Sequence, residues 1–423
     1  MIITSVPATG RAAGRAARDL AVWAEARHLT PFAMTSFSLG FGIIAGAWFT
    51  GLTMRDSAIG FAALVVSVST ARVARAMNAR PLTVASEWGQ AACVMLAEVA
   101  IYGGLAGSVS LRGGTGLAGP IGDQLHGGAL AGIGGTGMAG VWRLAIAAAI
   151  VLALRQMADL CAAGPQAYPP RLGSARLLVV GIVDLLAGPR LALLMAVALG
   201  VLGLLYVLVR PSDTVRPDTT GVAGYRGDGP LSAWIGGFVH GRLPPIPPLL
   251  VGLLVTCMLA ALGLGNLPGI LVLTPAEAML LAALGSSHLH DGRRDWRVPA
   301  LLQAGEYIFL AAAGYAGRVP APVTFALIVA VALRHLDMAW RARNRVPLSW
   351  FFSRRWPRLP RADWRGLGWE GRMIVAGVSV WAGVSLAVYI TLAAYLALLE
   401  VADFLGGWIN AGYRGGLKGG PHP

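Results

Sequence analysis

Acidic side chains and lysine are scarce in this chain. Its 423 residues include 20 Asp and Glu, and Lys418 is the single lysine among 34 basic residues. Charged residues make up 13% of the chain, whereas about a quarter is usual for soluble domains. This shortage of charge argues against a soluble globular protein.

Cysteine pairs and a signal peptide are also missing. Cys93, Cys161 and Cys257 are scattered through apolar sequence, so their spacing predicts neither a disulfide framework nor a metal site. The first 30 residues lack the apolar core of a signal peptide. Because Arg11–His28 has the pattern of an arginine-bearing amphipathic helix, we predict a helix in residues 1–30 that lies along the membrane surface.

Long apolar runs dominate what remains. The chain is 56% hydrophobic, and its mean hydropathy is +0.64. Several runs are long enough to cross about 30 Å of hydrocarbon as helices. We therefore predict an all-α polytopic membrane protein with about 12 transmembrane helices in two six-helix halves. The predicted spans are 33–53, 57–71, 88–107, 138–158, 176–187, 191–209, 247–264, 267–285, 299–316, 320–337, 372–386 and 388–409.

The basic residues predict the orientation of these spans. With both termini cytoplasmic, few of the 34 basic residues face outward, as the positive-inside rule requires. Topology explains the net charge of +14, so no nucleic-acid partner is predicted. The expected location is the inner membrane, and a homodimer is an open alternative for its assembly. The outward basic residues are Arg55, Arg112, Arg143, Arg190 and Arg318.

Composition also predicts the domain boundaries. A six-helix membrane domain at 31–210 precedes a cytoplasmic linker rich in Pro, Gly and Asp at 211–246. A second six-helix domain at 247–410 and a cytoplasmic tail at 411–423 follow.

The cytoplasmic loop at 338–371 combines eight arginines with five tryptophans. This combination indicates contact with anionic lipid head groups. The alternative is a basic anchor that only fixes the topology. The five tryptophans are Trp340, Trp350, Trp356, Trp364 and Trp369.

The two halves share sequence patterns in the same order, which suggests an internal duplication. The third span of each half carries one glutamate, in LAEVAIYGGLAG (Glu98) and in AGEYIFLAAAG (Glu306). The fourth spans end in ALRQMAD and ALRHLD. The fifth and sixth spans also correspond: SARLLVVGIVDLLAG (174–188) of the first half matches EGRMIVAGVSVWAGV (370–384) of the second half.

The segment LTPFAMTSFSLGFGIIAG at 29–46, followed by SVSTARVAR at 67–75, resembles the CDP-alcohol phosphotransferase family. The resemblance covers roughly residues 15–210. It implies a six-helix membrane fold that transfers a phospho-alcohol from a CDP-linked donor to an acceptor alcohol. In that family, four aspartates of the signature D-x-x-D-G-x-x-A-R, then G-x-x-x-D-x-x-x-D, hold divalent metal and supply the base.

The family's metal ligands are absent from this sequence. With the signature placed on Ala74 and Arg75, its first two aspartates fall at Ser67 and Thr70 and its glycine at Ala71. No aspartate is kept in the second part either. Because Mg²⁺ and Mn²⁺ prefer carboxylate oxygens, no cofactor is expected in this half, and either ion is expected only if the chain is active.

The second half offers a different polar cluster, SSHLHDGRRDWRVP at 286–299. His288, His290, Asp291 and Asp295 could together hold a transition metal, with Asp291 and Glu306 in catalysis. The plainer alternative is a polar turn between two helices.

Charged residues near the helix ends allow two interpretations. Arg155/Asp159 and Arg334/Asp337 each share a helix face, so each could be a local ion pair. Alternatively, Arg75, Arg155 and Arg334 could line a cytoplasmic cavity that binds phosphate or an anionic lipid.

Three functions remain open from the sequence. The first is a non-catalytic or lipid-binding homologue of CDP-alcohol phosphotransferases. The second is a divergent transferase that uses residues of the second half and a CDP-linked donor. The third is a transporter or flippase with Glu98 and Glu306 in its path.

Overall fold

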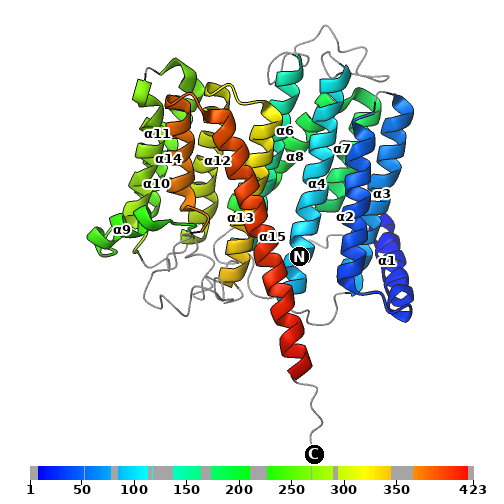
Figure 1. Ribbon diagram of the computed structural model, residues 1–423. Helices are drawn as coiled ribbons and strands as arrows, with labels where there is room; N and C mark the ends of the chain where they lie inside the picture. Colours follow the sequence, from blue (N-terminus) through cyan, green and yellow to red (C-terminus); the bar gives the residue numbers. More distant parts are fainter. Residues whose placement is uncertain are drawn as a thin grey trace, which may run out of the picture. The chain divides into compact units, whose positions relative to one another are not determined.

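The computed structural model describes residues 8–51, 53–77, 84–112, 117, 137–162, 173–209, 226–267, 269–288, 294–343 and 365–417. Every element within these ranges is helical, which confirms the all-α prediction (Figure 1). The chain divides into two compact units. Unit 1 comprises residues 1–145 and 171–196, and unit 2 comprises residues 146–170 and 197–423.

Seven described helices are long and apolar enough to cross a membrane. This supports a polytopic membrane protein. They coincide with seven of the predicted spans, and each is at least 19 residues long. The seven are α2 (Pro31–Phe49), α3 (Met54–Met77), α4 (Val84–Arg112), α6 (Gly137–Ala162), α8 (Pro189–Val209), α13 (Ala321–Arg343) and α15 (Ser385–Leu417).

The other five predicted spans are helical but do not belong to this set. Four are single helices, and the span predicted at 267–285 is a succession of short turns rather than one regular helix. Pro275 within it lacks a backbone N–H, and Gly269 has a positive φ of 53°. The twelve-span topology therefore stays a prediction. The elements concerned are α7 (Gly173–Ala187), α10 (Ile246–Leu262), α12 (Val298–Ala316), α14 (Gly368–Trp381), and the run η5 (Gly269–Leu273), α11 (Thr274–Met279) and η6 (Leu280–Gly285).

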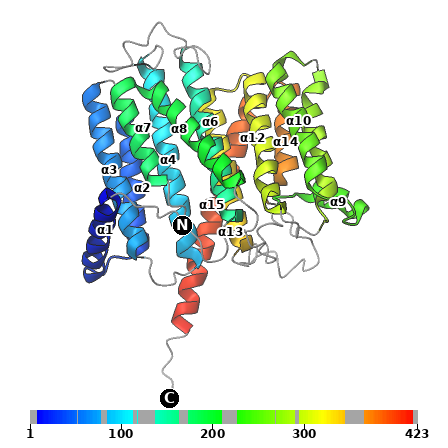
Figure 2. The same ribbon diagram turned by 180° about the vertical axis from the view of Figure 1, so that it is seen from behind.

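Unit 1 is built around α2, which packs between α3 and α4. A Cβ at Gly104 of α4 would overlap the carbonyl oxygen of Gly46 on α2, so only glycine permits this approach. The helix predicted near the N-terminus is present as α1 (Ala8–Ala26). Its Ala21 and Ala24 pack into a small apolar core against α3. Figures 1 and 2 show α1 beside α3.

Unit 2 has α12 at its centre, in contact with α10, α13 and α14, while α15 packs against α13 and α14. The segment predicted as a linker at 211–246 contains a short helix, α9 (Pro230–Val239), which packs against η6. This arrangement brings the charged residues of α12, α13, α14 and α15 together.

Candidate functional site

A buried ion pair joins α12 to α14. Glu306 and Arg372 are both 0% exposed. Arg372 donates from Nε to Oε1 of Glu306 at 2.6 Å and from Nη2 to Oε2 at 3.2 Å. Its Nη1 donates to the carbonyl oxygen of Gly366 at 2.7 Å. This bidentate pairing fixes the orientation of both side chains.

His335 of α13 completes this cluster. Its Nε2 lies 2.7 Å from Nη2 of Arg372 and 3.1 Å from Oε2 of Glu306. Its Nδ1 lies 3.0 Å from the hydroxyl of Tyr307. His335 is therefore in contact with both members of the ion pair and with Tyr307.

Unit 1 contains a buried pair of the same kind. Arg176 of α7 donates from Nη2 to Oε2 of Glu98 on α4, and both side chains are at most 5% exposed. Both glutamates were singled out from the sequence, but neither arginine was. The signal was present, because the aligned segments SARLLVVG and EGRMIVAG place Arg176 opposite Arg372.

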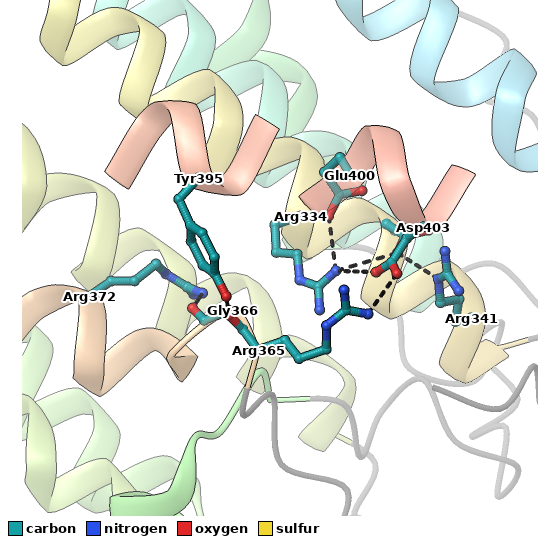
Figure 3. A network of polar contacts seen from close by, with 9 residues as sticks. Arg334, Arg341, Arg365, Gly366, Arg372, Tyr395, Glu400 and Asp403 are labelled. Atoms are coloured by element: carbon teal, nitrogen blue, oxygen red, sulfur yellow. Dashed lines mark hydrogen bonds and ion pairs between the residues drawn. The ribbon is translucent and has the colours of Figure 1, made fainter. Parts of the chain in front are cut away.

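The predicted pair of Arg334 and Asp337 has the longest distance in a larger network of ion pairs, which Figure 3 shows. Arg334 lies 4.0 Å from Asp337 but donates from Nη1 to Glu400 at 3.1 Å and to Asp403 at 3.0 Å, both on α15. Asp337 instead accepts from Arg341 at 2.6 Å. Arg365 donates to the second oxygen of Asp403 at 2.9 Å. Acids and arginines thus neutralise one another between α13 and α15.

The other two predicted phosphate ligands lie in separate environments. Arg155 pairs with Asp159 at 3.7 Å, as expected, and its guanidinium lies against Gly203 of α8. Arg75 donates from Nε to the carbonyl oxygen of Ala71 in its own helix at 3.2 Å. A cavity shared by Arg75, Arg155 and Arg334 stays a prediction.

The two positions that the resemblance assigns to the first aspartates, Ser67 and Thr70, are engaged in bonds within and between helices. Ser67 is 3% exposed and forms reciprocal bonds with Ser38 of α2. Ser67 Oγ donates to the carbonyl oxygen of Ser38 at 2.7 Å, and Ser38 Oγ donates to that of Ser67 at 2.8 Å. The hydroxyl of Thr70 bonds to backbone carbonyls one turn earlier in α3.

Side chains and backbone also fill the space around Ser67. A Cβ at Gly42 would lie 2.6 Å from Cβ of Ala97 and 3.4 Å from Oγ of Ser67. Ala74 is buried in the core under α1, and Ala71 is half-buried. Since the hydroxyls of Ser67 and Thr70 are engaged with backbone carbonyls and carry no charge, these residues do not fit the Mg²⁺ or Mn²⁺ that the resemblance implies.

The predicted metal cluster of the second half is described only in part. His290 and Asp291 lie outside the described residues. His288 places Nδ1 2.8 Å from the carbonyl oxygen of Gly241, and Asp295 is buried in η7 (Asp295–Arg297), directly before α12. Within the described part of the chain, no three His, Cys, Asp or Glu side chains form a metal-binding group.

A second polar cluster, unforeseen in the sequence, fastens α9 to α14. Glu370 accepts bonds from the amides of Gly229 at 3.0 Å and Ser232 at 3.1 Å, so its carboxylate caps α9. Trp369 donates from Nε1 to Asp228 at 2.9 Å. Burial raises the pKa of Glu370, while the two amides oppose that shift.

The predicted lipid-facing tryptophans divide into two groups. Trp340 and Trp369 are 5% and 0% exposed, so both are buried within unit 2 instead of facing head groups. Trp350, Trp356 and Trp364 lie outside the described residues. Contact between lipid and the loop at 338–371 therefore stays a prediction for its central part.

Comparison with known proteins gives one match. A family of unknown function, DUF5941, matches residues 219–416. The matched residues include Glu306, Arg372 and the Arg334 network, but not the pair of Glu98 and Arg176. No curated protein and no solved structure matches the chain.

Proposed function

We propose that this chain is a non-catalytic membrane scaffold of the CDP-alcohol phosphotransferase type. The observation that carries the proposal is the reciprocal bonding of Ser38 and Ser67 at 2.7 and 2.8 Å. Where the resemblance calls for a metal-binding carboxylate, two hydroxyls hold α2 against α3. A site for Mg²⁺ or Mn²⁺ has thus become a packing contact.

The buried carboxylates support the same conclusion. A general base must be able to reach the proton that it abstracts. Glu306 is 0% exposed and bonded to Arg372 through both oxygens. Glu98 is 2% exposed and paired with Arg176. Both carboxylates therefore stabilise the folded helices rather than serve a reaction or a transport path.

We also propose that the two halves descend from one six-helix unit with both termini cytoplasmic. The matching pairs support this interpretation. In each case a glutamate of the predicted third span binds an arginine at the start of the fifth, and the sequence patterns align the same residues. Contact of the loop at 338–371 with anionic lipid belongs to this proposal.

A CMP-release assay tests the lack of catalysis. The purified full chain in phospholipid vesicles is incubated with a CDP-linked alcohol, Mg²⁺ or Mn²⁺, and candidate acceptor alcohols. We expect CMP release at the rate of protein-free vesicles, with and without metal, because no metal-binding carboxylates occupy the signature positions.

The control variant addresses the alternative active site. Metal-dependent CMP release by the natural chain that disappears in Asp291→Ala would establish a divergent transferase and overturn the scaffold proposal. Release that is equal in both chains and independent of metal identifies background hydrolysis, as the scaffold proposal requires.

A further inference from the structure

Helix α9 is a fixed element, although it lies in sequence that resembles a linker. The Glu370 carboxylate caps its first turn, and Trp369 holds Asp228 just before it. Arg226 donates to Asp228 at 3.0 Å and also to the carbonyl oxygen of Ala282 in η6. Because these hydrogen bonds hold the residues before α9 and its first turn, they also determine which side of α9 faces the rest of unit 2.

One face of α9 is packed against η6 and the residues that follow it, within unit 2. Ser232 is 0% exposed, and its carbonyl oxygen accepts a bond from Ser286 Oγ at 2.9 Å. A Cβ at Gly236 would overlap that same serine hydroxyl, so a side chain here would displace Ser286 Oγ. Since Ser232 and Gly236 are four residues apart, they define the inward face.

The opposite face carries two large aromatic side chains. Trp234 is 63% exposed and Phe238 is 68% exposed. Their rings are 4.7 Å apart between centroids and meet edge to face at 86°. They also lie four residues apart, so together they form a preorganised apolar ridge on the outward face of α9.

The sequence after α9 carries further exposed basic and apolar side chains. His240, Arg242 and Leu243 are exposed in the connection. Helix α10 begins at Ile246, and its Leu250 and Leu254 are exposed apolar residues. An aromatic face beside a basic residue, close to the end of an apolar helix, matches the chemistry of the membrane–water interface.

We propose that α9 is an interfacial anchor, with Trp234 and Phe238 inserted at the head-group boundary of the membrane and Arg242 in contact with anionic lipid. Under the predicted topology this is the cytoplasmic leaflet. The proposal is independent of whether the chain is catalytic, because it rests only on the surface of α9 and its attachment to α14.

Spin-label accessibility measures the depth of this face. Labels are attached at Trp234→Cys or Phe238→Cys in a full chain without native cysteines (Cys93→Ser, Cys161→Ala, Cys257→Ser), reconstituted in phosphatidylcholine–phosphatidylglycerol vesicles. Leu254→Cys on α10 gives the hydrocarbon reference, because Leu254 is 71% exposed and apolar. We expect both α9 labels to be relaxed more by oxygen than by a water-soluble nickel complex, at a shallower depth than position 254.

Three outcomes decide the proposal. Relaxation of both labels mainly by nickel would place α9 in water and overturn it. Exclusion of both relaxing agents would indicate a protein partner on this face and would also overturn it. The third outcome concerns Arg242. If the labels lie deeper in vesicles with phosphatidylglycerol than in phosphatidylcholine alone, and Arg242→Gln abolishes this difference, Arg242 contacts anionic head groups. If the depth does not depend on phosphatidylglycerol, the proposed contact of Arg242 with anionic lipid is wrong.

Discussion

Replacing Arg372 by methionine is expected to lower the free energy of unfolding by about 3–5 kcal/mol, because the substitution removes the guanidinium that neutralises the buried Glu306 carboxylate. The arginine donates to both oxygens of Glu306, and neither residue has exposed surface. Reversible unfolding of the purified chain in mixed detergent micelles measures the change. The double variant Glu306→Gln/Arg372→Met should recover part of the loss, since the buried charge is gone.

Arg365→Met provides the matched control. The side chain of Arg365 is 38% exposed and also pairs with a carboxylate, Asp403. Exposed pairs contribute about 0–1 kcal/mol, so this variant should unfold almost as the natural chain does. If Arg372→Met lowers the free energy of unfolding no more than Arg365→Met does, the Glu306–Arg372 pair does not stabilise the packing of α12 against α14.

Placing an aspartate where the proposed resemblance assigns the first metal ligand is expected to destabilise the protein instead of creating a metal site. Ser67→Asp should lower the free energy of unfolding by about 3–5 kcal/mol, because it places an unpaired charge between packed helices. The position is 3% exposed, its hydroxyl bonds to Ser38, and a Cβ at Gly42 would lie 3.4 Å from its oxygen. The same unfolding measurement applies, with and without Mg²⁺.

Ser67→Ala is the control for the lost hydrogen bonds. It should cost about 1–3 kcal/mol, because the partner groups on Ser38 are left buried. A Ser67→Asp chain that is as stable as the natural one, or that Mg²⁺ stabilises strongly, would mean that the position still belongs to a cation site.

The sequence was sufficient to find the buried carboxylates but not their partners. Glu98 and Glu306 stand out as single charges in apolar runs, and such charges in membrane helices need compensation. Arg176 and Arg372 lie at the beginnings of predicted spans, where the positive-inside rule alone explains an arginine. Their role depends on how the third and fifth helices pack, which hydropathy does not contain.

Helix-face rules had a similar limit at Arg334. Its spacing to Asp337 predicts a local pair, yet Glu400 and Asp403 lie closer, at 3.1 and 3.0 Å. These two acids are more than 60 residues away in the sequence. Local spacing identifies neighbours on one helix, whereas the dominant contact comes from the helix packed against it.

Composition alone also did not predict the environment of two tryptophans and of the segment around α9. Trp340 and Trp369 follow the pattern of interfacial tryptophans but are buried, and the indole of Trp369 bonds to Asp228. Conversely, Pro and Gly around α9 suggest a linker, although the segment is held by a carboxylate of α14. In both cases tertiary hydrogen bonds outweigh the local preference.

The most direct measurement of whether unit 1 retains a metal site is Mn²⁺ binding followed by electron paramagnetic resonance. The purified chain is titrated with Mn²⁺ in the presence of CDP, and the signal of free Mn²⁺ is recorded. We predict that the signal equals that of a protein-free sample, because Ser67 and Thr70 present no carboxylates. If the protein removes one equivalent of free Mn²⁺ from the signal, and the double variant Ser67→Ala/Thr70→Ala no longer does so, the proposal of a non-catalytic scaffold is contradicted.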